Sequence, residues 1–369
     1  MIIAQVQRDV LLKPLQAVTG IVEKRHTLPI LSNVLLQRKQ ENLLLVATDL
    51  EIQVSTNSAG QSKGAEDVSL TVSARKLQDI LRALPEDTEV LLDAQNNRLQ
   101  VRAGKSRFNL QTLPAEDFPS MAEPGDPLAR LSLPQQALHD LLLLVQYAMA
   151  QQDIRYYLNG LLLVLEGEHI RVVATDGHRL GYAAAKLDQV LEKREVILPR
   201  KAVLELAKQL GGGDEPVTVE VFANQVKFTF GNVELVTKVI DGKFPDYTRV
   251  IPPNYHKHIV LNRVVLQQAL QRAAILANEK FRGVRWMLTG NSLRISCTNN
   301  EQEEAQEELE VSYDGDALDV GFNITYLLDV LNNVQDEEVT CSFGDASSSM
   351  LVTVKENDNF RYVVMPMRI

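Results

Sequence analysis

Apolar and polar positions along the chain follow the same order three times. Each copy begins with a short strand that leads into an amphipathic helix, starting at Val6, Leu133 and Leu261. A strand that ends in a polar turn comes next, closing on Asp49, Asp176 and Asn299. Alternation of apolar and polar residues around these turns predicts antiparallel strands.

A second strand and a second helix complete each copy. Arg75, Arg200 and Thr325 stand at the start of these helices and are 125 residues apart. Apolar residues then recur at spacings of three and four, which predicts amphipathic helices. The first two copies close with a Phe-Pro turn, at Phe118-Pro119 and Phe244-Pro245.

A period near 125 residues is long enough for each copy to bury its own core. Proline-rich polar segments at 124–127 and 252–255 resemble linkers. The pattern therefore predicts an α+β protein of three tandem similar domains, residues 1–127, 128–255 and 256–369. Each domain is expected to pack two helices on antiparallel sheets.

The composition narrows the class of protein. The 369 residues carry a net charge of −10, which argues against a protein that grips nucleic acid by bulk positive charge. The N-terminus does not resemble a signal peptide, and no apolar run has the length of a membrane span. The two cysteines, Cys297 and Cys341, have no metal-site spacing. We expect a cytoplasmic protein without membrane association, metal or cofactor.

The strongest candidate for an enzymatic site is the segment Thr175-Asp176-Gly177-His178-Arg179. Asp176 and His178 could perform acid–base chemistry. Alternatively the segment is a turn, in which Asp176 accepts backbone N–H groups and Gly177 supplies a positive φ. The matching segment of the first copy, at 48–51, has no histidine. This favours the turn, and we expect no catalytic residues.

Several segments taken in order along the chain are unusual enough to identify a family. They are Leu28-Pro29-Ile30-Leu31, Asp153-Ile154-Arg155-Tyr156-Tyr157-Leu158-Asn159-Gly160, Ala174-Thr175-Asp176-Gly177-His178-Arg179-Leu180, Phe244-Pro245-Asp246-Tyr247, Asn278-Glu279-Lys280-Phe281-Arg282-Gly283-Val284 and Val364-Met365-Pro366-Met367-Arg368. They resemble the bacterial sliding clamps, the beta subunits of DNA polymerase III, over essentially the whole chain.

The resemblance implies the DNA clamp fold and a processivity factor that catalyses nothing itself. Two copies would join head to tail as a homodimer, domain 1 of each meeting domain 3 of the other. The six domains would form a ring around double-stranded DNA of any sequence, with helices lining the hole. DNA polymerases and the clamp loader would dock through short peptides. A closed ring holds DNA by topology, which would account for the acidic net charge.

Basic residues on the predicted helices are the candidates for weak contacts with DNA phosphates. They are Arg25, Arg75, Lys76, Arg82, Lys201 and Arg272. The resemblance selects Arg25, Gln152, Tyr156, Tyr157 and Lys201, and the tyrosines could stack on exposed bases. Any single Lys or Arg of this set could equally be a solvated surface charge.

The resemblance also implies an apolar groove for partner peptides. Its residues would be Arg155, Leu158, Thr175, Gly177, His178, Arg179, Leu180, Pro245, Arg249, Val250, Ser349, Val363, Val364, Met365, Pro366, Met367 and Arg368. Leu, Val, Pro and flexible Met could line a pocket for Leu or Phe side chains, and the Arg and His side chains could hydrogen-bond a peptide. Alternatively the apolar tail is only a final strand.

The expected seam between two copies pairs an acidic segment with a basic one. Residues 301–308 include Glu303, Glu304 and Glu307, while Lys76, Lys105 and Arg107 lie in the first domain. Opposite charges of this kind steer assembly. Phe108 and Leu110 could pack on Ile275 and Leu276 across the seam. The family pattern has Glu where this chain has Gln306, which would weaken one ion pair. Without the resemblance, a solvated acidic face would be favoured.

Two other hypotheses remain beside the DNA clamp. A scaffold of three repeated domains that does not bind DNA would lack a basic face where the helices meet. An enzyme using Asp176 and His178 would need a nucleophile or a metal that the sequence does not supply.

Overall fold

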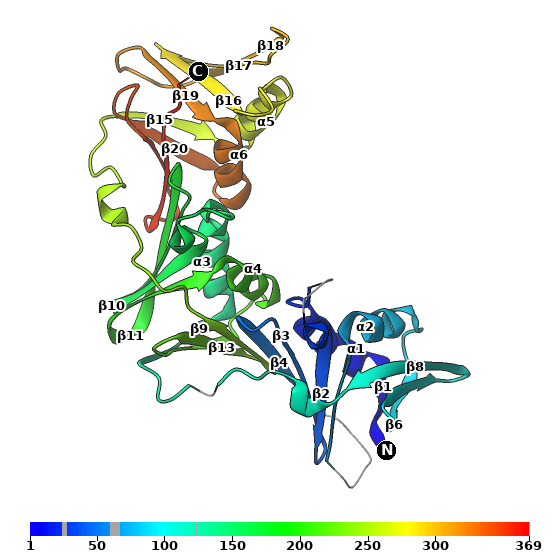
Figure 1. Cartoon of the computed structure of the whole chain (residues 1–369). Helices are drawn as coiled ribbons and strands as arrows, with labels where there is room; N and C mark the ends of the chain where they lie inside the picture. Colours follow the sequence, from blue (N-terminus) through cyan, green and yellow to red (C-terminus); the bar gives the residue numbers. More distant parts are fainter. Residues whose placement is uncertain (24–27, 60–66, 123, 369) are drawn as a thin grey trace. The chain divides into compact units, whose positions relative to one another are not determined.

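The computed structural model describes residues 1–23, 28–59, 67–122 and 124–368 (Figure 1). Arg25 lies outside the described residues. The chain forms two compact units, Met1–Leu138 with Leu204–Val239, and His139–Val203 with Ile240–Ile369. The middle repeat therefore contributes strands to both units. Among the described residues, no helix combines the length and the apolar character needed to cross a membrane.

The first unit is built on one antiparallel sheet, with helices α1 (Arg8–Thr19) and α2 (Ala74–Ala83). Its strand order is β1-β6-β7-β8-β5-β2-β3-β4-β14-β13-β12-β9. The strands are β1 (Ile2–Gln7), β2 (Asn33–Lys39), β3 (Asn42–Thr48), β4 (Ile52–Ala59), β5 (Val68–Ser73), β6 (Glu89–Gln95), β7 (Arg98–Ala103), β8 (Ser106–Leu113), β9 (Ala129–Pro134), β12 (Pro216–Val221), β13 (Gln225–Phe230) and β14 (Val233–Lys238).

Helix α1 shows why the apolar spacing produces this arrangement. Leu11, Leu15 and Val18 are spaced by four and three residues, so they share one face and are buried. That face packs on β3 and β4 and beside α2 (Figure 1). Leu77 and Leu81 bury the matching face of α2.

The second unit holds two antiparallel sheets. The first has the order β10-β11-β22-β21-β20-β15 and the second the order β18-β17-β16-β19. The strands are β10 (Gly160–Thr175), β11 (Arg179–Pro199), β15 (Lys257–Asn262), β16 (Gly283–Thr289), β17 (Ser292–Thr298), β18 (Glu304–Glu310), β19 (Leu318–Asn323), β20 (Glu338–Phe343), β21 (Met350–Val354) and β22 (Phe360–Val364). Helices α5 (Arg263–Ala274) and α6 (Ile324–Asn333) pack against each other.

The strand pairs confirm the threefold repeat. The strand that precedes the second helix of each copy pairs with the copy's second strand through Asn33–Ser73, Gly160–Pro199 and Gly283–Asn323. The strand that precedes the first helix pairs through Gln7–Glu89, Pro134–Pro216 and Asn262–Glu338. With α3 (Gln135–Val145) and α4 (Arg200–Gln209) in the middle copy, each copy supplies two helices, as the sequence predicts.

Candidate functional site

An apolar groove with a cavity of about 220 Å³ lies in the second unit. Thr175 at the end of β10, Leu180 in β11 and Val363 in β22 form its floor, since these strands are neighbours in one sheet. Pro245, Tyr247 and Val250 form one wall around the short helix η5 (Tyr247–Arg249). The remaining lining residues are Arg155, Leu158, Gly177, Arg179, Phe244 and Met365.

The turn after β10 shapes one end of the groove. An oxygen of the Asp176 carboxylate, Oδ1, accepts the backbone N–H groups of His178 and Arg179, at 2.9 and 3.1 Å. Gly177 has φ +88°, a left-handed conformation that favours glycine. The first repeat has the same turn, in which Asp49 accepts the N–H groups of Glu51 and Ile52. This geometry supports the turn interpretation, because the Asp176 carboxylate accepts backbone N–H groups of its own turn.

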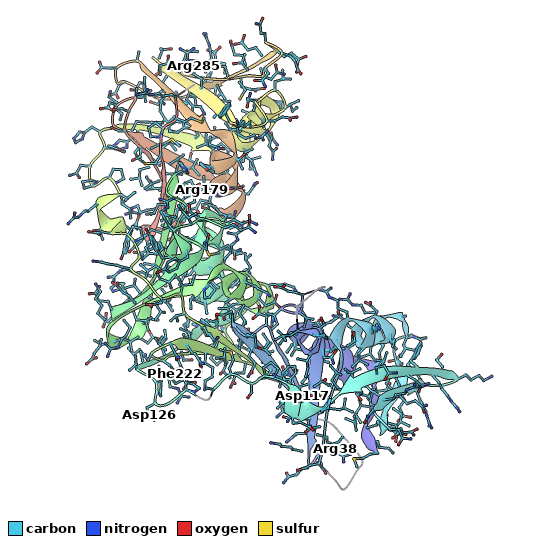
Figure 2. The ribbon with its side chains drawn as sticks, in the orientation of Figure 1. Arg38, Asp117, Asp126, Arg179, Phe222 and Arg285 are labelled. Carbon is cyan, nitrogen blue, oxygen red and sulfur yellow. The ribbon has the colours of Figure 1, made fainter. Side chains whose placement is uncertain are left out.

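Arg179 ties the groove to helix α6. Its guanidinium lies 3.1 Å from Asp176 and 2.5 Å from Asp329, and donates to the carbonyl of Tyr147 at 2.7 Å. It also lies over the ring of Tyr326, 4.4 Å from the centroid. Figure 2 shows Arg179 where the green strands of the second unit meet the orange α6. Its donors are engaged inside the protein, so we expect Arg179 to shape the groove rather than to bind a peptide.

Arg155 forms a lip of the groove beside the turn at Gly177, where its guanidinium donates to the carbonyl of Asp176 at 3.3 Å. Two of its nitrogens donate to the carboxylate of Asp153 at 3.1 and 2.9 Å, and these hydrogen bonds lower the pKa of Asp153 to about 2. A Cβ atom added to Gly177 would lie 3.0 Å from the Arg155 guanidinium. Asn159 holds the loop by bonding the backbone of Asp153 at both its N–H and its carbonyl. The lip is therefore a preorganised cation.

Ten of the predicted groove residues line the cavity. They are Arg155, Leu158, Thr175, Gly177, Arg179, Leu180, Pro245, Val250, Val363 and Met365. Seven do not line it, namely His178, Arg249, Ser349, Val364, Pro366, Met367 and Arg368. The carbonyl of His178 accepts the N–H of Met365, while Met367 and Arg368 line a different cavity beside Phe281.

Sequence reasoning missed two lining residues, Phe244 and Tyr247. Both lie in the Phe244-Pro245-Asp246-Tyr247 segment that carried part of the resemblance. The aromatic side chains on either side of Pro245 were the available signal, because large rings beside a predicted groove residue are expected to add apolar surface.

The candidate DNA contacts differ in how they are held. Arg75 donates to the carbonyl of Val22 at 2.7 Å, and Arg200, its equivalent in the next repeat, donates to the carbonyl of Met149 at 3.2 Å. This shared bond gives Arg75 a structural role. Lys76 and Arg82 are exposed, and Lys201 is half-buried. Arg272 pairs with Glu307 at 2.6 Å.

Gln152, Tyr156 and Tyr157 lie together in the loop that carries Arg155. Gln152 has φ +57°, and Tyr156 is 57% exposed. The two tyrosine rings meet edge to face with centroids 5.9 Å apart. One aromatic surface is therefore available beside the groove lip.

The residues predicted for the seam form two separate clusters, one in each unit. Lys76 lies on α2 and Lys105 in the turn before β8, while Arg107, Phe108 and Leu110 lie in β8, all in the first unit. Ile275, Leu276, Glu303, Glu304 and Glu307 lie on α5, β18 and the adjoining turns of the second unit. Ile275 is 78% exposed, an unusual exposure for a large apolar side chain.

Family models for the DNA polymerase III beta subunit match almost the whole chain. The N-terminal domain model matches residues 3–122, the central domain model 132–246 and the C-terminal domain model 248–368. The chain belongs to the DNA polymerase III beta subunit family. This confirms the family that the sequence segments indicated, and identifies the chain as a sliding clamp.

Curated and solved relatives agree with this assignment. The beta sliding clamp of Escherichia coli K12 is 45% identical over 99% of both chains, and that of Pseudomonas aeruginosa is 46% identical over the same share. A P. aeruginosa clamp structure matches with a TM-score of 0.94 at 45% identity, covering 99% of each chain. A Caulobacter crescentus clamp matches with a TM-score of 0.93 at 36% identity, covering 99% of this chain and 98% of that chain. The expected fold of three tandem clamp domains is confirmed.

Proposed function

We propose that two copies of this sliding clamp close into a ring around duplex DNA through the two predicted seam clusters. The observation that carries this proposal is a strand pairing that joins repeat 1 to repeat 2 and repeat 2 to repeat 3. The strand after the polar turn of one repeat pairs with the last strand of the next. These pairs are β4–β14, with Gln53 opposite Val236, and β11–β22, with Leu180 opposite Val363.

Two strands are left without this kind of partner among the described strands. β18, the strand after the polar turn of repeat 3, is an edge whose one neighbour is β17. β8, the last strand of repeat 1, pairs over residues 106–111 with β7 alone. An exposed edge presents unpaired N–H and C=O groups and is a template for another chain. Pairing β18 of one copy with β8 of another would complete the series, and two such seams would close a dimer.

The repeat also supports a register for this seam. Val236, Val363 and Asn109 occupy equivalent positions. Each pairs with a residue of the middle strand that itself pairs with the fifth residue of the strand before, in β12, β20 and β6. The equivalent of Gln53 and Leu180 is Glu304, since the three face the threonines that end β3, β10 and β17. Glu304 of one copy is therefore expected opposite Asn109 of the other. Ala305 would then face Phe108, and Gln306 would face Arg107.

Charge and apolar surface support the same seam. Arg102 and Arg107 lie directly opposite each other on β7 and β8, a pairing of like charges that destabilises a free hairpin. β18 carries Glu304, Glu308 and Glu310 on its exposed face. Bringing this acidic strand to the basic hairpin would relieve the repulsion. The stabilisation of the dimer would be greatest if the apolar side chains of Phe108 and Ile275 were also buried in the seam.

The DNA side of the proposal rests on topology rather than on tight binding. A ring keeps hold of DNA without strong phosphate contacts, which fits a net charge of −10. We assign transient contacts to Arg25, Lys76, Arg82, Gln152, Tyr156, Tyr157 and Lys201, with Arg75 in a mainly structural role. We further propose that the protein catalyses no reaction, acts in the cytoplasm and divides into domains at residues 1–127, 128–255 and 256–369.

We assign the apolar groove to short peptides of partner proteins, namely DNA polymerases and the clamp loader. A floor of Leu180 and Val363 between the cationic Arg155 and the wall at Tyr247 fits apolar anchor side chains flanked by polar or acidic groups. A P. aeruginosa sliding clamp has been solved bound to griselimycin, so a relative takes a ligand.

Retention on circular DNA tests the proposed function. The protein would be loaded on a nicked circular plasmid with a bacterial clamp loader and ATP, and then separated from free protein by gel filtration in high salt. We expect it to elute with the circular plasmid and to leave when a restriction enzyme linearises the DNA. Equal retention before and after linearisation, or no retention at all, would exclude a ring and favour the scaffold that does not bind DNA.

A further inference from the structure

The groove wall at η5 contacts the sheet through two tyrosine rings that are tilted against each other. The ring of Tyr247, which lines the groove, lies 5.9 Å from that of Tyr182 with an interplanar angle of 32°. Tyr182 follows Leu180 by two residues in β11, so both side chains point to the same face of the sheet. The wall and the floor of the groove therefore meet at this pair.

An arginine lies near the pair on the neighbouring strand. Arg171 in β10 is close to both phenol groups, and its guanidinium donates to Glu166 at 2.8 Å. Both tyrosines pack against the buried cluster that contains Val173 and Val363. Burial raises the pKa of Tyr247, so its hydroxyl stays neutral under ordinary conditions. The pair is a fixed part of the groove.

The other polar attachments of η5 stay within its own segment. Asp246 accepts the N–H and the hydroxyl of Thr248 at 3.2 and 2.6 Å, and it pairs with Arg249 at 3.0 Å. These bonds shape the turn without tying it to the sheet. Phe244 is buried in the cluster at the start of this segment, and Tyr247 and Ile251 pack against the same cluster, so what lies under Tyr247 helps to set the position of the wall.

The first repeat provides an internal comparison. Its Phe118-Pro119 turn leads to Met121 where the second repeat has Tyr247. Ser55 stands where the second repeat has Tyr182, because Ser55 pairs with Glu234 as Tyr182 pairs with Arg361. The clamp domain therefore folds without the aromatic pair. The pair occurs in the repeat that holds the groove, which favours a role in the groove over a role in folding.

We propose that Tyr182 is a positioning residue that fixes the η5 wall and thereby sets which apolar side chain of a partner peptide the groove accepts. This inference rests on the proposed peptide binding at the groove. Close packing of Tyr182 beneath Tyr247 holds the wall at a width suited to Leu or Phe, and a packed wall discriminates between side chains by size. Arg171 supports the same wall from β10.

Selectivity among matched peptides tests the inference. The probes are fluorescein-labelled peptides of one sequence that end in Leu, Phe or Trp, measured by fluorescence anisotropy with the full-length protein. In Tyr182→Ala, the affinity for the Trp peptide relative to the Leu peptide should rise by roughly tenfold, because the wall can retreat. Tyr182→Phe keeps the ring and should keep the ratio. Arg171→Met should shift the ratio in the same direction as Tyr182→Ala, by less.

The possible outcomes separate the inference from the proposed function. An unchanged ratio in a folded Tyr182→Ala protein overturns the inference while peptide binding stands. Equal weakening of all three peptides also overturns it, because that result indicates a structural role. If Tyr182→Ala does not fold, the ratio in Arg171→Met decides. Failure of the unmodified protein to bind any of the three peptides contradicts the proposed groove itself.

Discussion

At the scale of single residues, the groove depends on buried or half-buried charges that are fully paired. Arg179 is the clearest case, since its side chain is 10% exposed and contacts Asp176, Asp329 and the Tyr147 carbonyl. A buried pair adds little net stability compared with an apolar pair, but removing one partner leaves the remaining charge less well compensated. Loss of Asp329 is therefore expected to cost more than loss of an exposed carboxylate.

We predict that Asp329→Ala lowers the free energy of unfolding of the second unit by about 2 kcal/mol, because Arg179 loses one of its two carboxylate partners. The single tryptophan, Trp286, is buried in that unit, so its fluorescence in urea follows the transition. Glu168→Ala is the matched control, because its partner Lys186 is largely exposed and such pairs contribute about 0.5 kcal/mol. Equal losses of unfolding free energy in the two variants would show that the Arg179–Asp329 pair contributes no more than an exposed pair.

At the scale of elements, β18 combines features that protect an edge strand. Glu304 and Glu308 are exposed, and Glu307 points inward to the bidentate Arg272. Charges on an edge, especially inward-pointing ones, discourage pairing with arbitrary strands. They leave pairing open to a strand with complementary charge. β8 carries Arg107, and Lys105 lies in the turn before it. In the proposed seam, negative charge on this edge would select a basic partner strand.

A charge swap tests the expected register of these two strands. Arg107→Glu places an acid against the acidic edge and should weaken the dimer by at least about tenfold. Adding Gln306→Lys, opposite position 107 in the proposed register, should recover most of the loss. Analytical ultracentrifugation measures both. Adding Glu310→Lys in place of Gln306→Lys brings the same basic residue at a non-matching position, and equal recovery there would contradict the register.

The sequence predicted the repeated elements well because each repeat is amphipathic at fixed spacings. The turns at Asp49 and Asp176 were also predictable, since side-chain bonds to the backbone within a few residues are local. The wall contact of Tyr247 on Tyr182 was not, because it joins positions 65 residues apart in sequence through the sheet register. Likewise, the bond that engages Arg75 depends on Val22, and a repeat pattern does not reveal it.

At the scale of the whole molecule, threefold repetition explains how an acidic protein can hold DNA inside a closed ring. In each repeat, the strand after the polar turn pairs with the last strand of the next repeat. Three repeats therefore leave one such edge unpaired at each end of the series. Two molecules can then pair their unpaired edge strands with each other at two seams, and the closed ring needs no strong affinity for phosphate. Weak contacts permit sliding, because each phosphate contact adds a salt-dependent hold on the DNA.

Disulfide closure of the proposed seam is the sharpest test of a ring made from two copies. Glu304→Cys and Asn109→Cys are introduced together, and mild oxidation should give covalently closed dimers on non-reducing gels, because directly opposed strand residues come close enough to bridge. The native Cys297 and Cys341 are buried and should add no background. The control combines Glu304→Cys with Arg107→Cys, two residues out of register. Monomers alone, open-ended ladders, or equal closure of the control would contradict two copies joined through β18 and β8 in this register.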